Sequence, residues 1–249
     1  MMHETNAPVF ISIVIPVYNE EQRIEVFLSK VISYVRKLKF IYEILIVDDG
    51  SVDATVKITD SVLKEALPGR YRIIKLVKNQ GKGGAVRKGM LEARGDYVFF
   101  IDADGSTAIE EIDRFIPLFS PGFDIYIAIR TVKHEAPLKR KFFGYGYIHL
   151  ANFLLNLKVS DFTCGFKCYR REAAQKVFSK QIINNWSFDA EDLYIAKKCG
   201  CKIKETPVYW AHCGGSKVKV LKNVIICGFD LLKIRYNDMC GRYDGVKRK

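Results

Sequence analysis

Short apolar runs alternate along the chain with stretches in which apolar residues recur every three or four positions. The runs are rich in β-branched and aromatic residues, which predicts strands at 10–16, 43–47, 71–77, 97–101, 124–129 and 203–210, with a further loop and strand at 161–169. The periodic stretches predict helices at 24–38, 56–63, 85–93, 109–120, 142–157, 171–178 and 220–234, and another that opens at 186–192. Asn19 is the expected cap of the first helix, and Ser51 or Asp53 that of the second.

This alternation of strands and helices indicates an α/β fold. It predicts a mostly parallel sheet with helices on both faces. Pro207 cannot donate a ladder hydrogen bond, so we expect the strand at 203–210 to lie at an edge. The strand at 97–101 is an unbroken apolar run and should be buried.

Two carboxylates one residue apart follow that buried strand. Asp102 and Asp104 flank Ala103 where the strand ends. Ligands of open α/β sheets gather at the carboxyl ends of the strands. Carboxylate oxygens together with substrate phosphates suit a hard divalent cation such as Mg²⁺. A cation site and an ordinary acidic turn both agree with these residues taken alone.

Two other strand ends carry polar or glycine-rich clusters that should face the same crevice. Asp48 and Asp49 could accept hydrogen bonds from a nucleobase or a ribose, or could cap the following helix. Gly81-Lys82-Gly83-Gly84 is similar to a phosphate-binding turn, although its spacing is not that of a Walker A loop. These clusters indicate an anionic, nucleotide-like ligand.

Asp189 and Glu191 lie at the start of a predicted helix. Acids there interact favourably with the helix dipole whether or not they have another role. Their functional interpretation is that they orient a polyhydroxylated substrate or act as a base.

The charge of the chain is strongly basic. Its 249 residues hold 40 Lys and Arg against 28 Asp and Glu, a formal net charge of +12, and clusters such as Lys139-Arg140-Lys141 lie in the second half. Such a chain favours an anionic partner: nucleic acid, an anionic membrane or a phosphorylated substrate. A nucleic-acid-binding protein is disfavoured, because acidic strand ends would repel phosphates unless a metal intervenes.

The apolar runs and the cysteines bear on the compartment. No run approaches the ~20 apolar residues of a membrane span, and the polar start at residues 1–7 has no signal-peptide core. The seven cysteines are scattered and should be reduced thiols. We therefore expect a cytosolic protein. The stretch 142–157 fits equally an amphipathic helix lying at a membrane interface and a helix packed on the core.

Taken in order, four motifs resemble the inverting glycosyltransferase family 2, which has the GT-A fold. They are Pro16-Val17-Tyr18-Asn19-Glu20, Asp48-Asp49-Gly50-Ser51, Asn79-Gln80-Gly81-Lys82-Gly83 and Asp102-Ala103-Asp104. In the second half, Ala151-Asn152-Phe153-Leu154, Asp161–Lys167 and Gly215-Ser216-Lys217 resemble the polyprenyl-phosphate sugar synthases, which include dolichyl-phosphate glucosyltransferases and mannose synthases.

That resemblance implies one domain, 1–249. About 10–130 would bind the nucleotide sugar, and about 131–249 would bind the acceptor through amphipathic, membrane-associated helices. The donor nucleoside would be bound by Pro16, Tyr18, Glu20, Val47 and Asp49, and the lipid phosphate by Arg130 and Arg140. Lys217 would bind the donor phosphates. Mg²⁺ or Mn²⁺ would be held by Asp102 and Asp104, with Ala103 alongside and Ser106 near the metal.

The resemblance also implies the reaction. A hexose would pass from a nucleotide-diphosphate sugar to a polyprenyl or dolichyl phosphate on the cytoplasmic face of a membrane, with Asp104, Arg130, Asp189 and Glu191 as the catalytic set. The pattern Phe188-Asp189-Ala190-Glu191 is nearer the glucosyltransferases, which favours UDP-glucose over GDP-mannose. An acceptor phosphate is already anionic, so it needs positioning more than a general base.

Two alternative enzymes remain open: a family 2 enzyme with a soluble or protein-linked glycan acceptor, and a nucleotidyltransferase. The partners left open are a second copy of the chain and a membrane protein.

Overall fold

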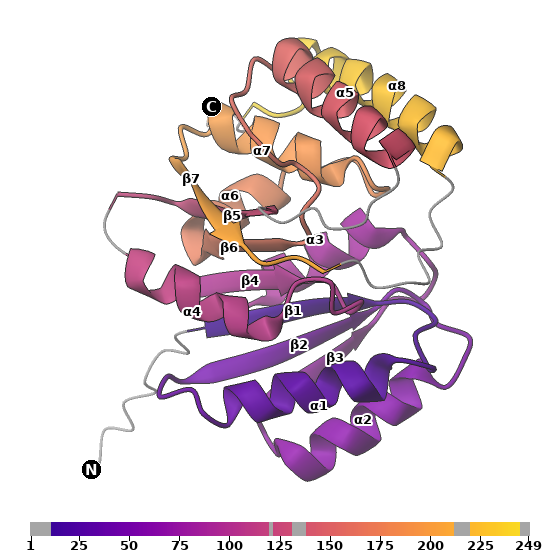
Figure 1. Ribbon diagram of the computed structural model, residues 1–249, viewed down its shortest axis with the longest axis vertical. Helices are drawn as coiled ribbons and strands as arrows, with labels where there is room; N and C mark the ends of the chain where they lie inside the picture. The colour runs from indigo at the N-terminus through magenta and orange to yellow at the C-terminus, as the bar shows by residue number, and fades with distance from the viewer. Residues whose placement is uncertain (1–10, 120–121, 131–137, 212–219, 245–249) are drawn as a thin grey trace, which may run out of the picture.

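The structure is a computed structural model of the chain, and it describes residues 11–119, 122–130, 138–211 and 220–244, with only the backbone described for 138–143 and 220–225. Its centre is a seven-stranded sheet (Figure 1). The strands are β1 (Ile11–Val17), β2 (Tyr42–Asp48), β3 (Tyr71–Lys75), β4 (Tyr97–Ile101), β5 (Ile125–Arg130), β6 (Phe166–Arg170) and β7 (Ile203–Val208).

The strand order, β3-β2-β1-β4-β6-β5-β7, places the apolar strand β4 in the middle of the sheet. All pairs are parallel except those of β6, which runs antiparallel to both β4 and β5. The parallel strands β1, β2 and β4 end at one edge, so the residues that follow them lie close together. β7 is an edge strand, as Pro207 predicts.

Helices cover both faces of the sheet, each over its own hydrophobic core. One face carries α1 (Ile24–Val35), α2 (Thr55–Ala66) and the short α4 (Ile112–Phe115) between 3-10 turns. The other carries α3 (Lys82–Glu92), α6 (Arg171–Phe178) and α7 (Phe188–Lys198). The prediction of an α/β fold with a mostly parallel sheet is confirmed.

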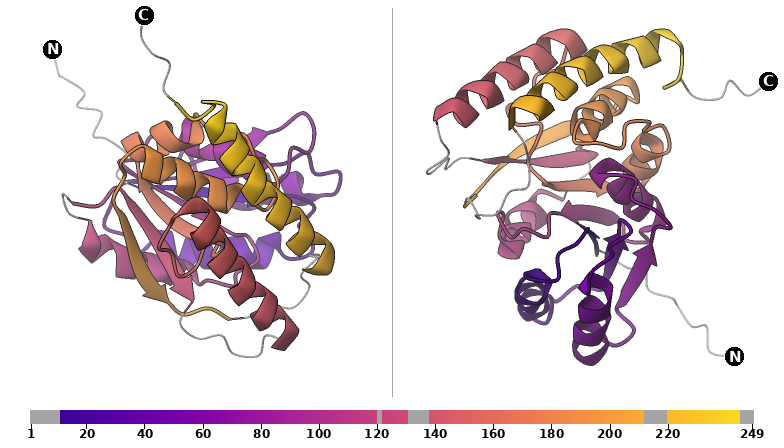
Figure 2. Two further views of the ribbon diagram at one scale, coloured as in Figure 1. Left: turned by 90° about the horizontal axis from the view of Figure 1, so that it is seen from above. Right: turned by 90° about the vertical axis from the view of Figure 1, so that its right-hand side faces the viewer.

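Two long helices form an extra layer outside α7. α5 (Leu138–Leu155) and α8 (Val220–Met239) lie side by side at the top of the molecule, and Figure 2 shows them crossing over the rest of that half. Ala151 and Leu155 of α5 are fully buried, whereas Phe153 is 82% exposed. The stretch predicted at 142–157 therefore has both a core-packing face and an exposed apolar face.

Several helices begin or end at other residues than the sequence predicts. α1 begins at Ile24 with Arg23 as its cap, and Asn19 instead adopts a left-handed backbone conformation with φ of 53°. The stretch expected to be one helix at 109–120 is broken into 3-10 turns around α4, since Pro117 removes a backbone donor. α3 begins at Lys82, three residues earlier than predicted.

Candidate functional site

The centre of the site is Asp102, the residue that follows β4. Its backbone N–H donates to the carbonyl of Gly165 at 3.0 Å, just before β6 begins. A Cβ on Gly165 would lie 1.9 Å from Asp102 Oδ2, closer than any real contact. The carboxylate of Asp102 therefore occupies a space that exists only because residue 165 is glycine.

Lys82, at the start of α3, is the direct partner of Asp102. Its Nζ lies 2.7 Å from Oδ1 and 2.8 Å from Oδ2 of that carboxylate. Burial by itself would lower the pKa of Lys82, but the carboxylates of Asp102, Asp189 and Asp104 raise it. The group is thus an ammonium at neutral pH. The Nζ atom of Lys82 also lies 5.1 Å from the ring centre of Trp186 and 5.9 Å from that of Phe188.

Asp104 supplies the second carboxylate. Its Oδ1 accepts the Ser106 N–H at 2.8 Å, which fixes the turn after β4, and Ala103 between the two acids is buried. Within the described ranges, no group of three or more Asp, Glu, His or Cys side chains forms a metal cage. Two carboxylates completed by substrate phosphates and water are the usual magnesium arrangement in nucleotide enzymes. The residues present fit a divalent cation that arrives with a diphosphate.

Asp49 organises the glycine-rich turn. Its two oxygens accept the N–H groups of Gln80 and Gly81, at 2.7 and 2.9 Å, and burial raises the pKa of this carboxyl. Gly81 has φ of 89°, and a Cβ there would lie 2.5 Å from the carbonyl of Asn184. The turn therefore needs glycine at this position, and Asp49 holds it against the end of β2.

The segment that follows β1 is tied to the turn that follows β2. Asn19 N–H donates to Ser51 Oγ at 2.9 Å, and Glu20 N–H donates to Thr55 Oγ1 at 2.7 Å. Tyr18 is exposed at this edge, and the Glu20 carboxylate pairs with Arg23. Pro16 is partly exposed in β1, whereas Val47 has no exposed surface, so a part for Val47 in donor binding could only be indirect.

Arg130, at the end of β5, is held by a bidentate ion pair. Its Nε donates to Asp161 Oδ2 at 2.6 Å, and its Nη2 donates to Asp161 Oδ1 and to Thr163 Oγ1, each at 2.7 Å. Burial opposes ionisation of Asp161, but the guanidinium outweighs it and lowers the pKa of Asp161 below its usual 3.8. Trp210 lies against the guanidinium, 5.5 Å from ring centre to Cζ.

This pair predicts a specific pH dependence. Because the folded-state pKa of Asp161 is lowered, its stabilisation is complete above 3.8 and is lost as the pH falls through the folded value. Asp161→Asn should lower the free energy of unfolding by about 3 kcal/mol at pH 7, since it leaves Arg130 unpaired. The difference from the native chain should shrink towards pH 3 in urea unfolding. A difference independent of pH would contradict the ion pair.

Asp189, predicted to orient substrate or act as a base, is buried in an ion pair with Lys167 of β6. The same Lys167 Nζ donates to the carbonyl of Phe162 at 2.8 Å and lies 5.2 Å from the ring centre of Phe100. The negative charge of Asp189 raises the pKa of both Lys82 and Arg130. Asp189 thus acts electrostatically on both cations, besides its ion pair with Lys167.

Glu191, the other predicted acid of α7, has no exposed surface. Its Oε2 accepts the N–H groups of Ile182 and Ile183, at 3.0 and 2.7 Å, and its Oε1 accepts the hydroxyl of Tyr243 at 2.6 Å. All of these partners lie within the protein. These contacts tie the segment that follows α8 to α7, and a catalytic role of Glu191 stays a prediction.

Glu191→Ala should accordingly act on stability. It leaves three donors, two of them buried, without an acceptor and opens a cavity, so we expect the free energy of unfolding to fall by about 3–5 kcal/mol. Below the unfolding temperature, the folded fraction should keep its affinity for nucleotide. Tyr243→Phe, which removes one of the three bonds, should cost about 1 kcal/mol. Normal stability together with lost nucleotide binding would support a part for Glu191 in the site.

Two predicted phosphate-binding residues lie outside the described parts. Lys217 belongs to an undescribed segment, and Arg140 lies in α5 where only the backbone is described. The structure also adds residues that the motifs did not single out as functional: Asp161, Gly165, Lys167 and Trp186. The first three belong to the Asp161–Lys167 motif. The signal available in the sequence was Gly165, a glycine directly before the strand at Phe166–Arg170.

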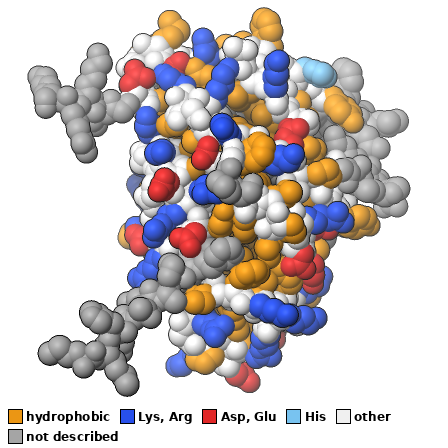
Figure 3. Space-filling model, turned by 90° about the vertical axis from the view of Figure 1, so that its left-hand side faces the viewer, with side chains coloured by type: hydrophobic (Ala, Val, Ile, Leu, Met, Phe, Trp, Pro, Cys, Tyr) orange, Lys and Arg blue, Asp and Glu red, His pale blue; other side chains and the backbone are white. Residues whose placement is uncertain are grey.

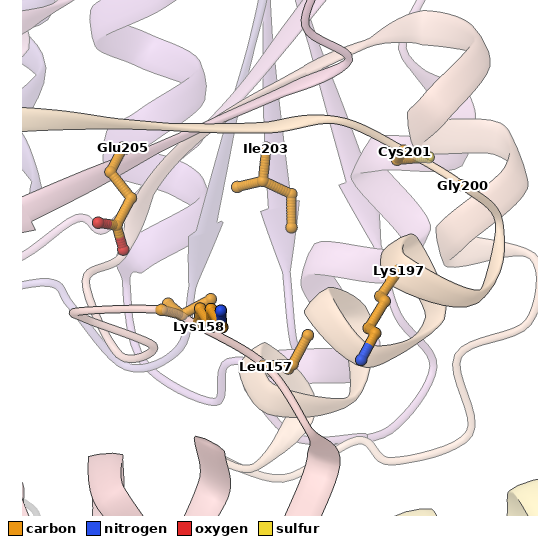
Figure 4. A pocket seen from close by; sticks show the side chains of 8 residues that line it. Leu157, Lys158, Lys197, Gly200, Cys201, Ile203 and Glu205 are labelled. Carbon is orange, nitrogen blue, oxygen red and sulfur yellow. The ribbon is translucent and has the colours of Figure 1, made fainter. Parts of the chain in front are cut away.

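A cavity of about 300 Å³ lies at the opposite end of the sheet (Figure 4). Lys158, Lys197 and Ile203 line it, and its Glu205 already accepts hydrogen bonds from Ser160. It contains none of the residues around Asp102. The six cysteines among the described residues form no disulfide with one another.

Comparison with known proteins identifies the family. Residues 12–178 match the profile of Glycosyl transferase family 2. Three curated relatives are each named dolichyl-phosphate beta-glucosyltransferase. The relative from Homo sapiens is 36% identical, and the match covers 94% of this chain and 77% of the relative. The relative from Dictyostelium discoideum is 34% identical, and the match covers 94% of this chain and 76% of the relative. That of Saccharomyces cerevisiae is 35% identical over 99% of this chain and 80% of its own length.

Solved structures agree on the fold. Glucosyl-3-phosphoglycerate synthase from Mycobacterium tuberculosis, in complex with Mn²⁺ and UDP-glucose, superposes with a TM-score of 0.66 at 19% identity. The match covers 93% of this chain and 79% of that one. At this identity the likeness concerns the GT-A architecture alone. With the family match, the chain belongs to glycosyltransferase family 2.

Proposed function

We propose that the protein transfers glucose from UDP-glucose to dolichyl phosphate, with Mg²⁺ or Mn²⁺ bound at Asp102 and Asp104. The observation that carries the proposal is the arrangement around Asp102: a carboxylate seated against Gly165, paired with Lys82, and followed by Asp104. The relatives, of which the match covers 76–80% of the length, are named dolichyl-phosphate beta-glucosyltransferase, which supports this choice of sugar and acceptor.

The donor half of the reaction rests on charge. A divalent cation, when bound, neutralises the diphosphate that leaves the sugar. Asp102 and Asp104 would hold it, Ser106 keeps Asp104 oriented through its N–H, and Lys82 supplies a further positive charge. Tyr18 and the segment fastened to Ser51 would bind the nucleoside at the neighbouring strand ends.

The acceptor half rests on Arg130. Its guanidinium is fixed by Asp161 and Thr163 through Nε and Nη2, which leaves the two N–H groups of Nη1 to donate to an acceptor phosphate. Arg130, with Arg140, would direct the acceptor phosphate at the anomeric carbon. A general base is not required, because the phosphate is already ionised, and the two acids predicted for that role are both engaged inside the protein.

Nucleotide binding tests the choice of donor. Calorimetric titration of the protein with UDP, with GDP and with UDP-glucose, each with and without Mn²⁺, should show metal-dependent binding of the two uridine ligands. Tighter binding of GDP would move the proposal to GDP-mannose. Binding of neither nucleotide, in the presence of Mn²⁺, would remove the donor half of the proposal.

The exposed apolar face of α5 and α8 supports peripheral association with the membrane that carries the acceptor. Large side chains protrude from it, including Phe153 of α5, and Phe229 and Met239 of α8, which are 69% and 81% exposed. None of the described helices has the length and apolar character needed to cross a bilayer. Amphipathic helices of this kind lie in the interface plane. The cytoplasmic face is the proposed side, where nucleotide sugars would be met.

On one face of the described residues, the distribution of charge is not that of a nucleic-acid-binding surface. On the face drawn in Figure 3, lysine and arginine side chains are scattered among acidic and apolar ones and form no continuous stripe. A nucleic-acid footprint is a clustered basic patch. A net charge of +12 still favours anionic lipid at long range.

Vesicle binding tests this membrane proposal. Replacing Phe153 and Phe229 together by serine should weaken binding to vesicles that contain anionic lipid by at least about tenfold, since each ring loses its burial in lipid. Binding by the native chain should also weaken with salt. Val77→Ser, at an exposed site beyond β3, is the control and should bind normally. Equal binding by the double variant, or none by the native chain, would point to a soluble acceptor.

A further inference from the structure

Lys82 occupies the place beside Asp102 where a metal ion would bind. Its ammonium lies within 2.8 Å of each oxygen of that carboxylate, and the two side chains are 14% and 28% exposed. An ammonium donates to the same lone pairs that a cation coordinates. Metal binding at Asp102 therefore requires Lys82 to give up at least part of this contact.

The surroundings of Lys82 keep it there while no donor is bound. The rings of Trp186 and Phe188 lie against the ammonium, and the nearby charges of Asp104 and Asp189 also attract it. Asp102 and Asp104, one residue apart, would repel each other without a cation between or beside them. The lysine thus stabilises the donor-free site in the way that a metal does in the loaded site.

The same lysine can leave without moving the backbone. Its stem is flexible, with four methylene groups, whereas α3 is anchored where Gly83 N–H donates to the carbonyl of Asn184 at 2.8 Å. A diphosphate placed at the ends of β1, β2 and β4 would offer Lys82 anionic oxygens in exchange for Asp102. Phosphate oxygens and a carboxylate are equivalent partners for an ammonium.

We propose that Lys82 is the resident counterion of Asp102 and that the donor diphosphate draws it away, which frees the carboxylate for the divalent cation. The cation and the nucleotide then bind with positive coupling, and the cation alone binds weakly. This inference rests on the proposed function, because it takes a nucleotide diphosphate as the ligand. Coupling of this kind is reciprocal: the nucleotide tightens Mn²⁺ by the same factor as Mn²⁺ tightens the nucleotide.

The test is a titration of Mn²⁺ followed by the electron paramagnetic resonance of the free ion, with and without saturating UDP. The native protein should bind Mn²⁺ at least about tenfold more tightly in the presence of UDP. A tenfold change corresponds to the free energy of one charge-assisted hydrogen bond, the one between Lys82 and Asp102. Lys82→Met should bind Mn²⁺ more tightly than the native protein when UDP is absent, and its gain on adding UDP should be smaller.

Two further variants make the result specific. Lys82→Arg keeps the charge and should keep weak Mn²⁺ binding without UDP. Lys88→Met removes a lysine from the same helix, where it pairs with Glu92 at the surface, and should leave both titrations unchanged. Circular dichroism of each variant establishes that it is folded.

The outcomes separate this inference from the proposed function. Unchanged Mn²⁺ affinity of Lys82→Met without UDP, together with weaker UDP binding, would make Lys82 a phosphate ligand only and overturn the counterion role. Loss of Mn²⁺ binding in Lys82→Met would overturn it as well. If the native protein bound UDP in no condition, the proposed function itself would fail.

Discussion

Gly165→Ala is expected to lower glucosyl transfer by at least about a hundredfold while the protein remains folded. The added Cβ would lie 1.9 Å from Asp102 Oδ2 and 2.2 Å from its Cγ. The backbones cannot separate easily, because Asp102 N–H is bonded to the Gly165 carbonyl at 3.0 Å. The carboxylate must then swing out of its place, and displacement of a reacting group by about 1 Å costs rate on the order of a hundredfold.

A methyl group forced into a packed site also costs stability, about 1–3 kcal/mol. Thermal unfolding and transfer should therefore be measured together. Gly122→Ala is the matched control, since nothing lies within 4 Å of a Cβ at that position. Native transfer by Gly165→Ala would show that the position of the Asp102 carboxylate does not matter to the reaction.

Asp104→Ala is expected to reduce transfer by at least about a thousandfold. Removing one of two carboxylates leaves the divalent cation without half of its protein ligands, and neutralisation of the leaving group is worth several kcal/mol. The cost to folding should be small, about 1 kcal/mol, because the side chain makes one bond, to the Ser106 N–H.

Turnover in saturating Mn²⁺ and the midpoint of urea unfolding measure the two effects separately. Asp60→Ala, which removes an exposed carboxylate bonded to the Tyr71 hydroxyl, is the control and should turn over normally. Near-normal turnover by Asp104→Ala would remove this residue from the metal site.

The sheet could be predicted from the sequence because its strands are short apolar runs bounded by turn residues. Tyr97–Ile101 is an unbroken apolar run, which is why the sequence predicts a buried strand there. Every side chain in it is indeed buried, as a position at the centre of the sheet requires. The edge position of β7 follows from one residue, Pro207. The convergence of Asp49, Gly81 and Asp102 follows from parallel strands that end at one edge.

The contacts between distant residues could not be predicted in this way. That Gly165 leaves room for Asp102 depends on the antiparallel pairing of β4 with β6, and no local pattern specifies that register. Asp189 and Glu191 look equivalent at the start of a helix. Only the packed structure shows that one meets Lys167 and the other meets Tyr243.

The cap of α1 shows a similar limit. Asn19 is of a residue type that commonly caps helices, yet its side chain accepts the Val52 N–H at 3.0 Å and so links two loops at the edge of the site. Local preference for a cap was overridden by a tertiary hydrogen bond. The motif Pro16–Glu20 is therefore explained by its place beside the Ser51 turn and not by the helix that follows it.

The most direct test of the account is transfer itself. The purified protein is incubated with Mn²⁺, short-chain dolichyl phosphate and either radiolabelled UDP-glucose or radiolabelled GDP-mannose, and label is counted in the organic phase. We predict that label enters the lipid from UDP-glucose, and that it does so only with a divalent cation present. Absence of label in the lipid from UDP-glucose, under conditions in which the protein binds UDP and Mn²⁺, would contradict the account.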